Sequence, residues 1–265
     1  MAISYSSISS GSQSGSTSVM YRAPASLSAG DLILWCVVNK YPTNGPGTPS
    51  GLALLARATV GDGGAAGADV GDVYATVFSR ESDGTEDGAT ESISIPGGNS
   101  ATSRSVSYSR SAGSGWAIAT ASGSQGAASS SWSVTTGSLD LAAGDVVVAL
   151  IAKSGDIDPT HSAHAFSASG VTFGSVNVAT LVHGTTQGDD CAMQVVDVPV
   201  TAGSGTGPVT FTMSLSGGAG MSSGGVLLVR LREDVAAAYT HPTLSNARMG
   251  SLTSTGGVPM VDYAF

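Results

Sequence analysis

The chain has 265 residues, a formal net charge of −9, and 41% hydrophobic but only 11% charged residues. This composition is too apolar for a disordered chain, and its length allows two domains that each bury a core. The few cations, among them only two lysines (Lys40 and Lys153), argue against binding to nucleic acid or to an anionic membrane surface. Apolar runs such as Val146–Ala152 are too short to span a bilayer, so no membrane insertion is expected.

Residues 1–17 are rich in Ser and Gly and form either an arm or a first edge strand. From residue 18, runs of strand-forming residues alternate with turns rich in Gly, Asp and Pro. In the first half the predicted strands are Ser18–Arg22, Asp31–Asn39, Leu52–Val60, Asp72–Glu81, Thr90–Ile95, Arg104–Ser109 and Gly115–Ala121. The low-complexity stretch Ser122–Ser130 is interpreted as a joint between two halves.

The second half of the sequence shows the same alternation of strand-forming runs and turns. Its predicted strands are Ser131–Thr135, Asp145–Lys153, Val171–Val182, Cys191–Val198, Val209–Leu215 and Gly225–Arg232. Only Glu233–Tyr239 has a mild helical pattern, for a turn or two. The predicted class is therefore all-β.

A duplication organises these strands. Leu27–Leu34 (LSAGDLIL) returns 114 residues later as Leu141–Val148 (LAAGDVVV), so a Leu-x-Ala-Gly-Asp turn twice precedes an apolar run. This spacing fits a whole small domain. We therefore predict two similar antiparallel β-sandwich domains, Ig-like or jelly-roll, at 18–125 and 126–237, followed by a segment at 238–265.

The last residues of that segment are unusually apolar. In Gly257–Phe265 an extended backbone places Val258, Met260 and Asp262 on one face and Val261, Tyr263 and Phe265 on the other. Such a segment suits a slot between two surfaces or the edge of a sheet. We predict a docking segment that contributes to a homo-oligomer or to attachment, with these interface residues: Val258, Met260, Val261, Tyr263 and Phe265.

Two patterns resemble catalytic or metal sites. Gly220–Gly224 satisfies G-x-S-x-G around Ser222, but that motif requires a strand-to-helix turn, and chance matches are expected in a chain rich in Ser and Gly. His161 and His164, near Asp156 and Asp158, could hold a metal only if a turn brought them together, and we interpret them as solvated loop histidines. No catalytic residue, cofactor or metal ligand is predicted, and the protein is not expected to be an enzyme.

Three other sets of residues have a structural interpretation beside a functional one. Carboxylates around the loop Ser82–Gly88 could bind Ca²⁺, although solvated turn carboxylates are favoured; they are Asp83, Glu86, Asp87, Glu91, Asp62, Asp69 and Asp72. Trp35, Trp116 and Trp132 could form a carbohydrate platform, although packing is favoured. Cys36 and Cys191 occupy different points of the two repeats and are expected to be free, buried thiols.

Several of these segments resemble a family of tailed-bacteriophage virion proteins built from tandem β-sandwich units. The resemblance rests on the turn and apolar run at Ser28–Val38, the stretch Pro49–Leu55, the strand Gly71–Arg80, and the ending from Pro242 to Phe265. Leu52 stands where similar phage proteins often have Trp. The resemblance implies an accessory virion role and no catalytic residues.

The expected function is a structural component of a bacteriophage virion, and a capsid decoration or cement protein is favoured. Its partners would be the major capsid protein or tail proteins. The alternative is a tail-tip or tail-fibre protein that binds a host surface glycan through loops such as Tyr41–Gly51. A secreted carbohydrate-active enzyme is disfavoured because no leader opens the sequence. We expect synthesis in the host cytoplasm and residence in the virion.

Overall fold

The structure is a computed structural model, and it describes residues 3–9, 12–14, 17–40, 45–63, 71–96, 100–111, 115–154, 160–179, 181–184, 191–216 and 222–234. All regular elements in these ranges are β-strands, which confirms the all-β prediction, and every strand pair in these ranges is antiparallel. The same ranges include no helix long and apolar enough to cross a membrane.

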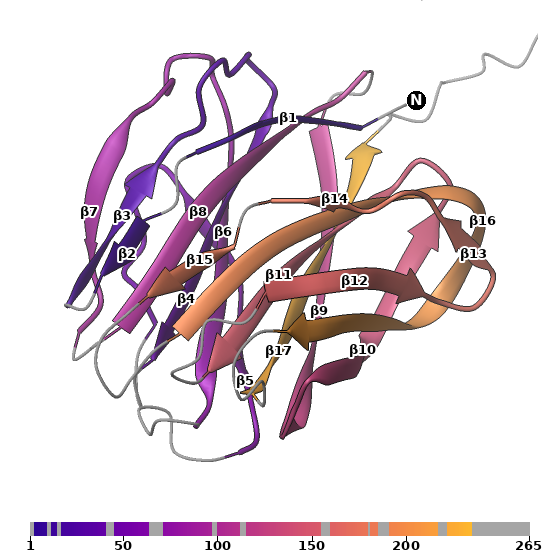
Figure 1. The fold of residues 1–265 in the computed structure, drawn as a ribbon. Helices are drawn as coiled ribbons and strands as arrows, with labels where there is room; N and C mark the ends of the chain where they lie inside the picture. Colours follow the sequence, from indigo (N-terminus) through magenta and orange to yellow (C-terminus); the bar gives the residue numbers. More distant parts are fainter. Residues whose placement is uncertain are drawn as a thin grey trace, which may run out of the picture. The chain divides into compact units, whose positions relative to one another are not determined.

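The first repeat forms one large sheet and one small sheet (Figure 1). In spatial order the large sheet contains β1 (Ser4–Ile8), β8 (Ser100–Ser109), β4 (Leu32–Lys40), β6 (Val73–Glu81) and β5 (Ala53–Val60), with β2 (Ser12–Ser14) also paired to β8. The small sheet pairs β3 (Ser18–Arg22) with β7 (Thr90–Ser94). Residues 1–17 thus include an edge strand, which was one of the two predicted alternatives.

The second repeat forms a sheet that is nearly closed like a barrel (Figure 1). Its order is β10 (Ser131–Ala142), β16 (Cys191–Ser216), β11 (Val146–Ser154), β17 (Ser222–Asp234) and β9 (Gly115–Ser129). Four shorter strands also pair with β16: β12 (Thr160–Ser167), β13 (Val171–Phe173), β14 (Asn177–Val178) and β15 (Val182–Gly184). The sheet curls because the first part of β16 pairs with β11 and its later part with β10 and β12.

The two repeats share their strand order. In the first, β4 lies between β8 and β6, and in the second, β11 lies between β17 and β16. Outside these, β1 on β8 corresponds to β9 on β17, and β5 on β6 corresponds to β14 and β15 on β16. The small-sheet pair β3–β7 corresponds to β10 paired with the later part of β16.

The two Leu-x-Ala-Gly-Asp turns share one backbone conformation and one capping hydrogen bond. The Asp31 carboxylate accepts a bond from the Ser28 N–H at 2.9 Å, and the Asp145 carboxylate accepts one from the Ala142 N–H at 2.8 Å. Gly30 and Gly144 have φ values of 92° and 96°, a region that strongly favours glycine. This local match places the two Asp residues at the equivalent turn positions that the duplication predicts.

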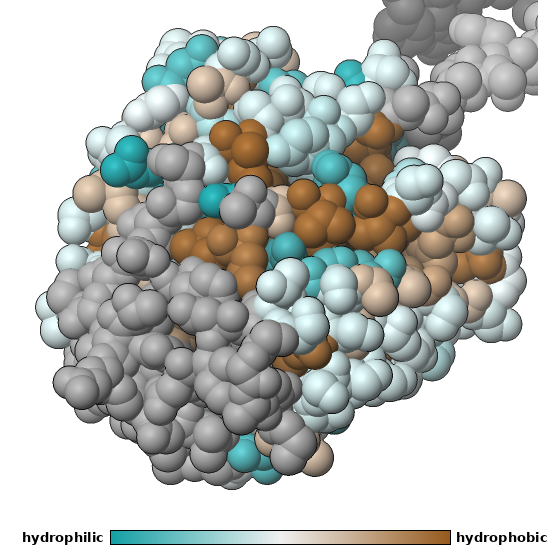
Figure 2. All heavy atoms as spheres, in the orientation of Figure 1, coloured by the Kyte–Doolittle hydropathy of each residue, from teal (hydrophilic) through white to brown (hydrophobic). Residues whose placement is uncertain are grey.

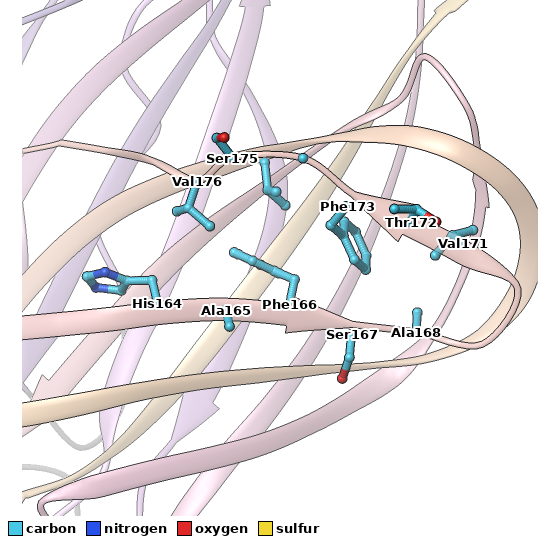
Figure 3. A pocket seen from close by; sticks show the side chains of 12 residues that line it. His164, Ala165, Phe166, Ser167, Ala168, Val171, Thr172, Phe173, Ser175 and Val176 are labelled. Carbon is cyan, nitrogen blue, oxygen red and sulfur yellow. The ribbon is translucent and has the colours of Figure 1, made fainter.

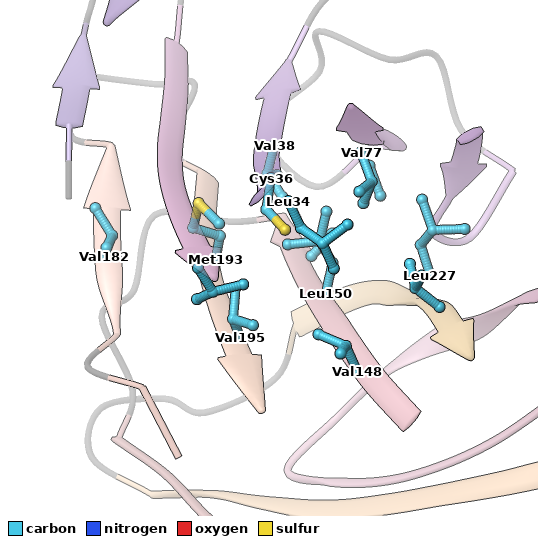
Figure 4. Packing of buried hydrophobic residues seen from close by; sticks show 14 of the residues in the cluster. Leu34, Cys36, Val38, Val77, Val148, Leu150, Val182, Met193, Val195 and Leu227 are labelled. Atoms are coloured by element: carbon cyan, nitrogen blue, oxygen red, sulfur yellow. The ribbon is translucent and has the colours of Figure 1, made fainter. Parts of the chain in front are cut away.

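The central strands are buried on both faces. Along β4, Leu34 and Cys36 face one core cluster while Trp35 and Val37 face another. Along β11, residues alternate in the same way between the cluster shared with β4 and a third cluster around Trp132 and Phe211. The shared cluster joins the large sheets of both repeats (Figure 4). Burial on both faces explains why these strands read as continuous apolar runs.

The predicted joint at Ser122–Ser130 is not a linker. Strand β9 continues to Ser129 and pairs with β17, so the boundary predicted between residues 125 and 126 lies inside a strand. Small residues are needed where β9 approaches β10: a Cβ on Gly123 would lie 2.6 Å from the Thr135 carbonyl oxygen. Met1–Val235 forms one compact unit by itself.

Further predictions about strands were wrong, and one of them is Val171–Val182, which is divided into β13, β14 and the start of β15. Cys191–Val198 and Val209–Leu215 belong to one strand, β16, because the Gly-rich stretch between them keeps pairing with β10 and β13 while it bends. Strand β12 was missed because its two histidines were placed in a loop. The helical turn predicted at Glu233–Tyr239 begins inside β17, and its remainder lies outside the described residues.

Candidate functional site

A slot opens in the second repeat between β12 and the stretch that includes β13 and residues 174–176 (Figure 3). Both sides pair with β16, β12 with its later part and β13 near its middle. The slot has a volume of about 630 Å³. Apolar residues also gather over β14, on the face shown in Figure 2, where Val178 is exposed.

The inner wall of the slot is apolar and half-buried. Phe166 and Phe173 point into the space between the two strands, with ring centroids 5.9 Å apart (Figure 3). Phe166 also packs edge-to-face against the buried Phe211, with ring centroids 5.1 Å apart. The half-buried side chains along this wall are His164, Phe166, Ala168, Val171, Phe173 and Val176. The slot therefore leads directly onto the third core cluster.

Two histidines meet at one end of this site. His161 Nδ1 lies 3.2 Å from Gln194 Oε1, and His164 Nε2 lies 2.9 Å from the same oxygen. An amide oxygen only accepts hydrogen bonds, so the facing nitrogen of each ring carries a proton. Gln194 Nε2 in turn donates to the Ala179 carbonyl at 3.0 Å, which ties β12 to the stretch between β14 and β15.

The prediction of solvated loop histidines was wrong. Both lie on β12, where His161 is buried and His164 is half-buried. They converge because the pairing of β12 shifts between Ser162 and Ala165, and Ala163 has a φ of 52°. One residue in the left-handed region resets the alternation, so side chains three apart reach one partner. Asp156 and Asp158 lie outside the described residues.

The environment of His164 favours its neutral form. Burial lowers its pKa, and the hydrogen bond to Gln194 opposes this in part. The residues that line the slot include no carboxylate and no cysteine among those described. The half-buried apolar side chains of this wall suit contact with an uncharged or extended apolar group.

The residues of the other predicted patterns lie on strands, and several of them are buried in the cores. Ser222 begins strand β17 and does not occupy a strand-to-helix turn. Trp35 and Trp132 are buried in the cores, which confirms the packing interpretation for them. Trp116 is half-buried, and its indole N–H donates to the Gly30 carbonyl at 3.0 Å. Cys36 and Cys191 are buried thiols outside any disulfide, as predicted, and burial raises the pKa of Cys36 to about 12.

The carboxylates of the predicted acidic loop serve its own architecture. Glu86 is buried, lies 2.6 Å from Arg80 Nη2 and accepts a bond from the Ser82 hydroxyl. Asp87 accepts a bond from the Leu27 N–H. Asp72, Asp83 and Glu91 each accept a backbone N–H bond, and Asp69 lies outside the described residues. No group of three or more His, Cys, Asp or Glu able to hold a metal occurs among the described residues.

The predicted docking segment, which contains Val258, Met260, Val261, Tyr263 and Phe265, lies outside the described residues. No protein-family model matches the chain, and neither a curated protein nor a solved structure matches it. The slot could not be found from sequence, because its two walls come together only through their pairing with β16. The one available signal was the pair Phe166 and Phe173 beside two histidines.

Proposed function

We propose that this protein is a non-enzymatic structural component of a bacteriophage virion, as a capsid decoration or cement protein in contact with the major capsid protein. The observation that carries the proposal is the duplication, whose two units bury their large sheets in one shared core. A body of this kind resists local opening, because each central strand is covered on both faces. Such rigidity suits a subunit that bears load on a particle.

We also propose a fold type for the two repeats. Each repeat is a jelly-roll-type sandwich in which the first strand pairs with the last, and the last pairs with a central strand. The orders β1-β8-β4-β6 and β9-β17-β11-β16 support this assignment in both copies. Jelly rolls are frequent in viral shell proteins, which adds a fold-level analogy to the sequence resemblance.

The chemistry of the described polar groups also favours a structural role. Buried carboxylates such as Asp145 and Glu86 bind arginines and turn N–H groups of the same chain. The buried Asp197 accepts bonds from the Tyr108 hydroxyl and the Asn177 amide. These groups stabilise strands and turns of the chain itself. Such stabilisation is expected in a structural subunit of a shell or tail.

Quantitative mass spectrometry of purified virions tests this proposal. A decoration protein should approach the copy number of the major capsid protein, and particles that lack it should lose resistance to heat or chelation. A few copies per particle would favour the tail-tip or tail-fibre alternative, in which the chain binds a host surface glycan. Absence from purified virions would contradict both.

A further inference from the structure

We propose that the slot between β12 and residues 171–176 is an acceptor site for a β-strand, and that the strand it takes is Val258–Phe265 of a second copy of this chain. The proposal rests on the structural role proposed above, since exchange of strands between copies links subunits within an assembly. It assigns a function to the slot and a receptor to the docking segment.

Both walls of the slot include strands to which a further strand can be added. Within the described part of the chain, β12 pairs only with β16, and so do β13 and β14. Each therefore has one edge without a strand partner, and an extended peptide that added to one of these edges would gain main-chain hydrogen bonds along it. The side chains that point inward would meet Phe166, Phe173 and Val176 (Figure 3).

The first repeat contains a counterpart of β12, beside the strand that corresponds to the later part of β16. There residues 45–52 run beside β7: the Gly47 N–H donates to the Ser94 carbonyl at 2.9 Å, and the Ser50 N–H donates to Glu91 at 2.8 Å. This stretch ends in the buried Leu52, which packs with Trp35 in the core. It leads directly into β5. In the second repeat, extra residues separate β12 from β14, and the slot lies between them.

The chemistry of Val258–Phe265 matches the slot. An extended backbone would place Val258 and Met260 on one face and Val261, Tyr263 and Phe265 on the other, so whichever face turned inward would bring apolar side chains into the slot. Its one charged residue is Asp262, and the described slot lining has no carboxylate to repel it. Burying each large side chain is worth about 1.5–3 kcal/mol, enough for several together to hold a strand.

The chain length permits exchange between copies. Twenty-three residues separate Asp234, the end of β17, from Val258. Fully extended, such a stretch reaches roughly 80 Å at about 3.3 Å per residue. A donor strand on one copy and an acceptor slot on another make a head-to-tail contact, which can close into a ring or extend along a surface.

Photo-crosslinking of the full-length protein tests the proposal. The variant Tyr263→p-benzoylphenylalanine would be prepared with ¹⁴N and with ¹⁵N, mixed, irradiated and analysed by mass spectrometry. We expect residue 263 of one isotope to cross-link to residues 160–178 of the other. An excess of the peptide Gly257–Phe265 should compete and reduce the cross-link several-fold without any change to the slot.

A matched pair of variants sharpens the result. Val176→Asp places a carboxylate in the slot and should reduce the cross-link at least fivefold, whereas Leu54→Asp, at an exposed apolar position on β5, should leave it unchanged. Cross-links confined to one isotope, or mapped outside 160–178, would overturn the proposal. Virion abundance is measured separately, so an abundant virion protein without this cross-link would reject only the acceptor site.

Discussion

The two Leu-x-Ala-Gly-Asp turns have the same backbone but different side-chain partners. In both, the Asp carboxylate caps a backbone N–H three residues earlier, and a glycine at positive φ precedes it. Asp145 also forms a two-point ion pair with Arg232, with N–O distances of 2.7 and 2.8 Å. Among the described residues, Asp31 has no such partner.

The difference comes from the neighbouring strand. Leu32 pairs with Tyr108 on β8, and Val146 pairs with Leu231 on β17. The residue after this partner is Ser109 in the first repeat and Arg232 in the second. Local sequence therefore sets the turn, while the residue that long-range pairing brings beside it decides whether the carboxylate gains a cation. This comparison leads to four predictions.

The largest effect should come from the core that the repeats share. Leu34 on β4 and Leu150 on β11 are both fully buried in it, so Leu34→Ala and Leu150→Ala should each reduce the free energy of unfolding by about 2–5 kcal/mol. Because the core is common, each variant should shift one transition that reports on both repeats. Calorimetry with two-probe denaturant unfolding measures this, and two independent transitions would show that the repeats fold separately.

The turns themselves provide the next test. Asp145→Asn removes the charged partner of Arg232 and should cost about 2–3 kcal/mol, because hydrogen bonds between charged groups are the strong ones. Asp31→Asn keeps an oxygen for the Ser28 N–H and should cost about 1 kcal/mol or less. Chemical denaturation of both variants gives the two values. Equal losses would show that the ion pair contributes nothing beyond the turn.

A smaller effect is expected at the contact between the repeats. The Tyr108 hydroxyl donates to the buried Asp197 at 3.2 Å, whereas Leu231, the residue at the equivalent position, is apolar. Tyr108→Phe removes one donor from that carboxylate and should cost about 1–2 kcal/mol. The control Tyr5→Phe, on a partly exposed edge residue, should be nearly neutral in the same denaturation experiment. A neutral Tyr108→Phe would contradict a structural role for this bond.

The smallest effect concerns pH and only the second repeat. Burial lowers the pKa of His164 in the folded protein relative to about 6.5 in the unfolded chain. The unfolded state then binds more protons below that value, so stability should fall as the pH drops from 7.5 to 5.5. His164→Gln keeps a donor toward Gln194 but cannot titrate, and should flatten this part of the melting temperature profile. A profile unchanged by the substitution would assign the pH dependence to other groups.

The sequence by itself determined the elements whose signals are local. The strands after the two Asp turns, the edges at Gly and Pro clusters, and the all-β class follow from patterns within a few residues. The continuous apolar runs of β4 and β11 also indicate burial on both faces, but they do not say which sheet lies on each face. Only the tertiary structure shows that each strand packs against the other repeat.

The candidate site depended on long-range structure throughout. His161 and His164 stand three apart, and an unbroken strand would turn them to opposite faces; the shift at Ala163 brings both to Gln194, thirty or more residues away in the chain. The slot exists because β12 and β13 pair with different parts of one long strand. The low-complexity stretch in β9 was misinterpreted for a related reason. Small residues there reflect close approach of strands, and composition alone does not distinguish close packing from a linker.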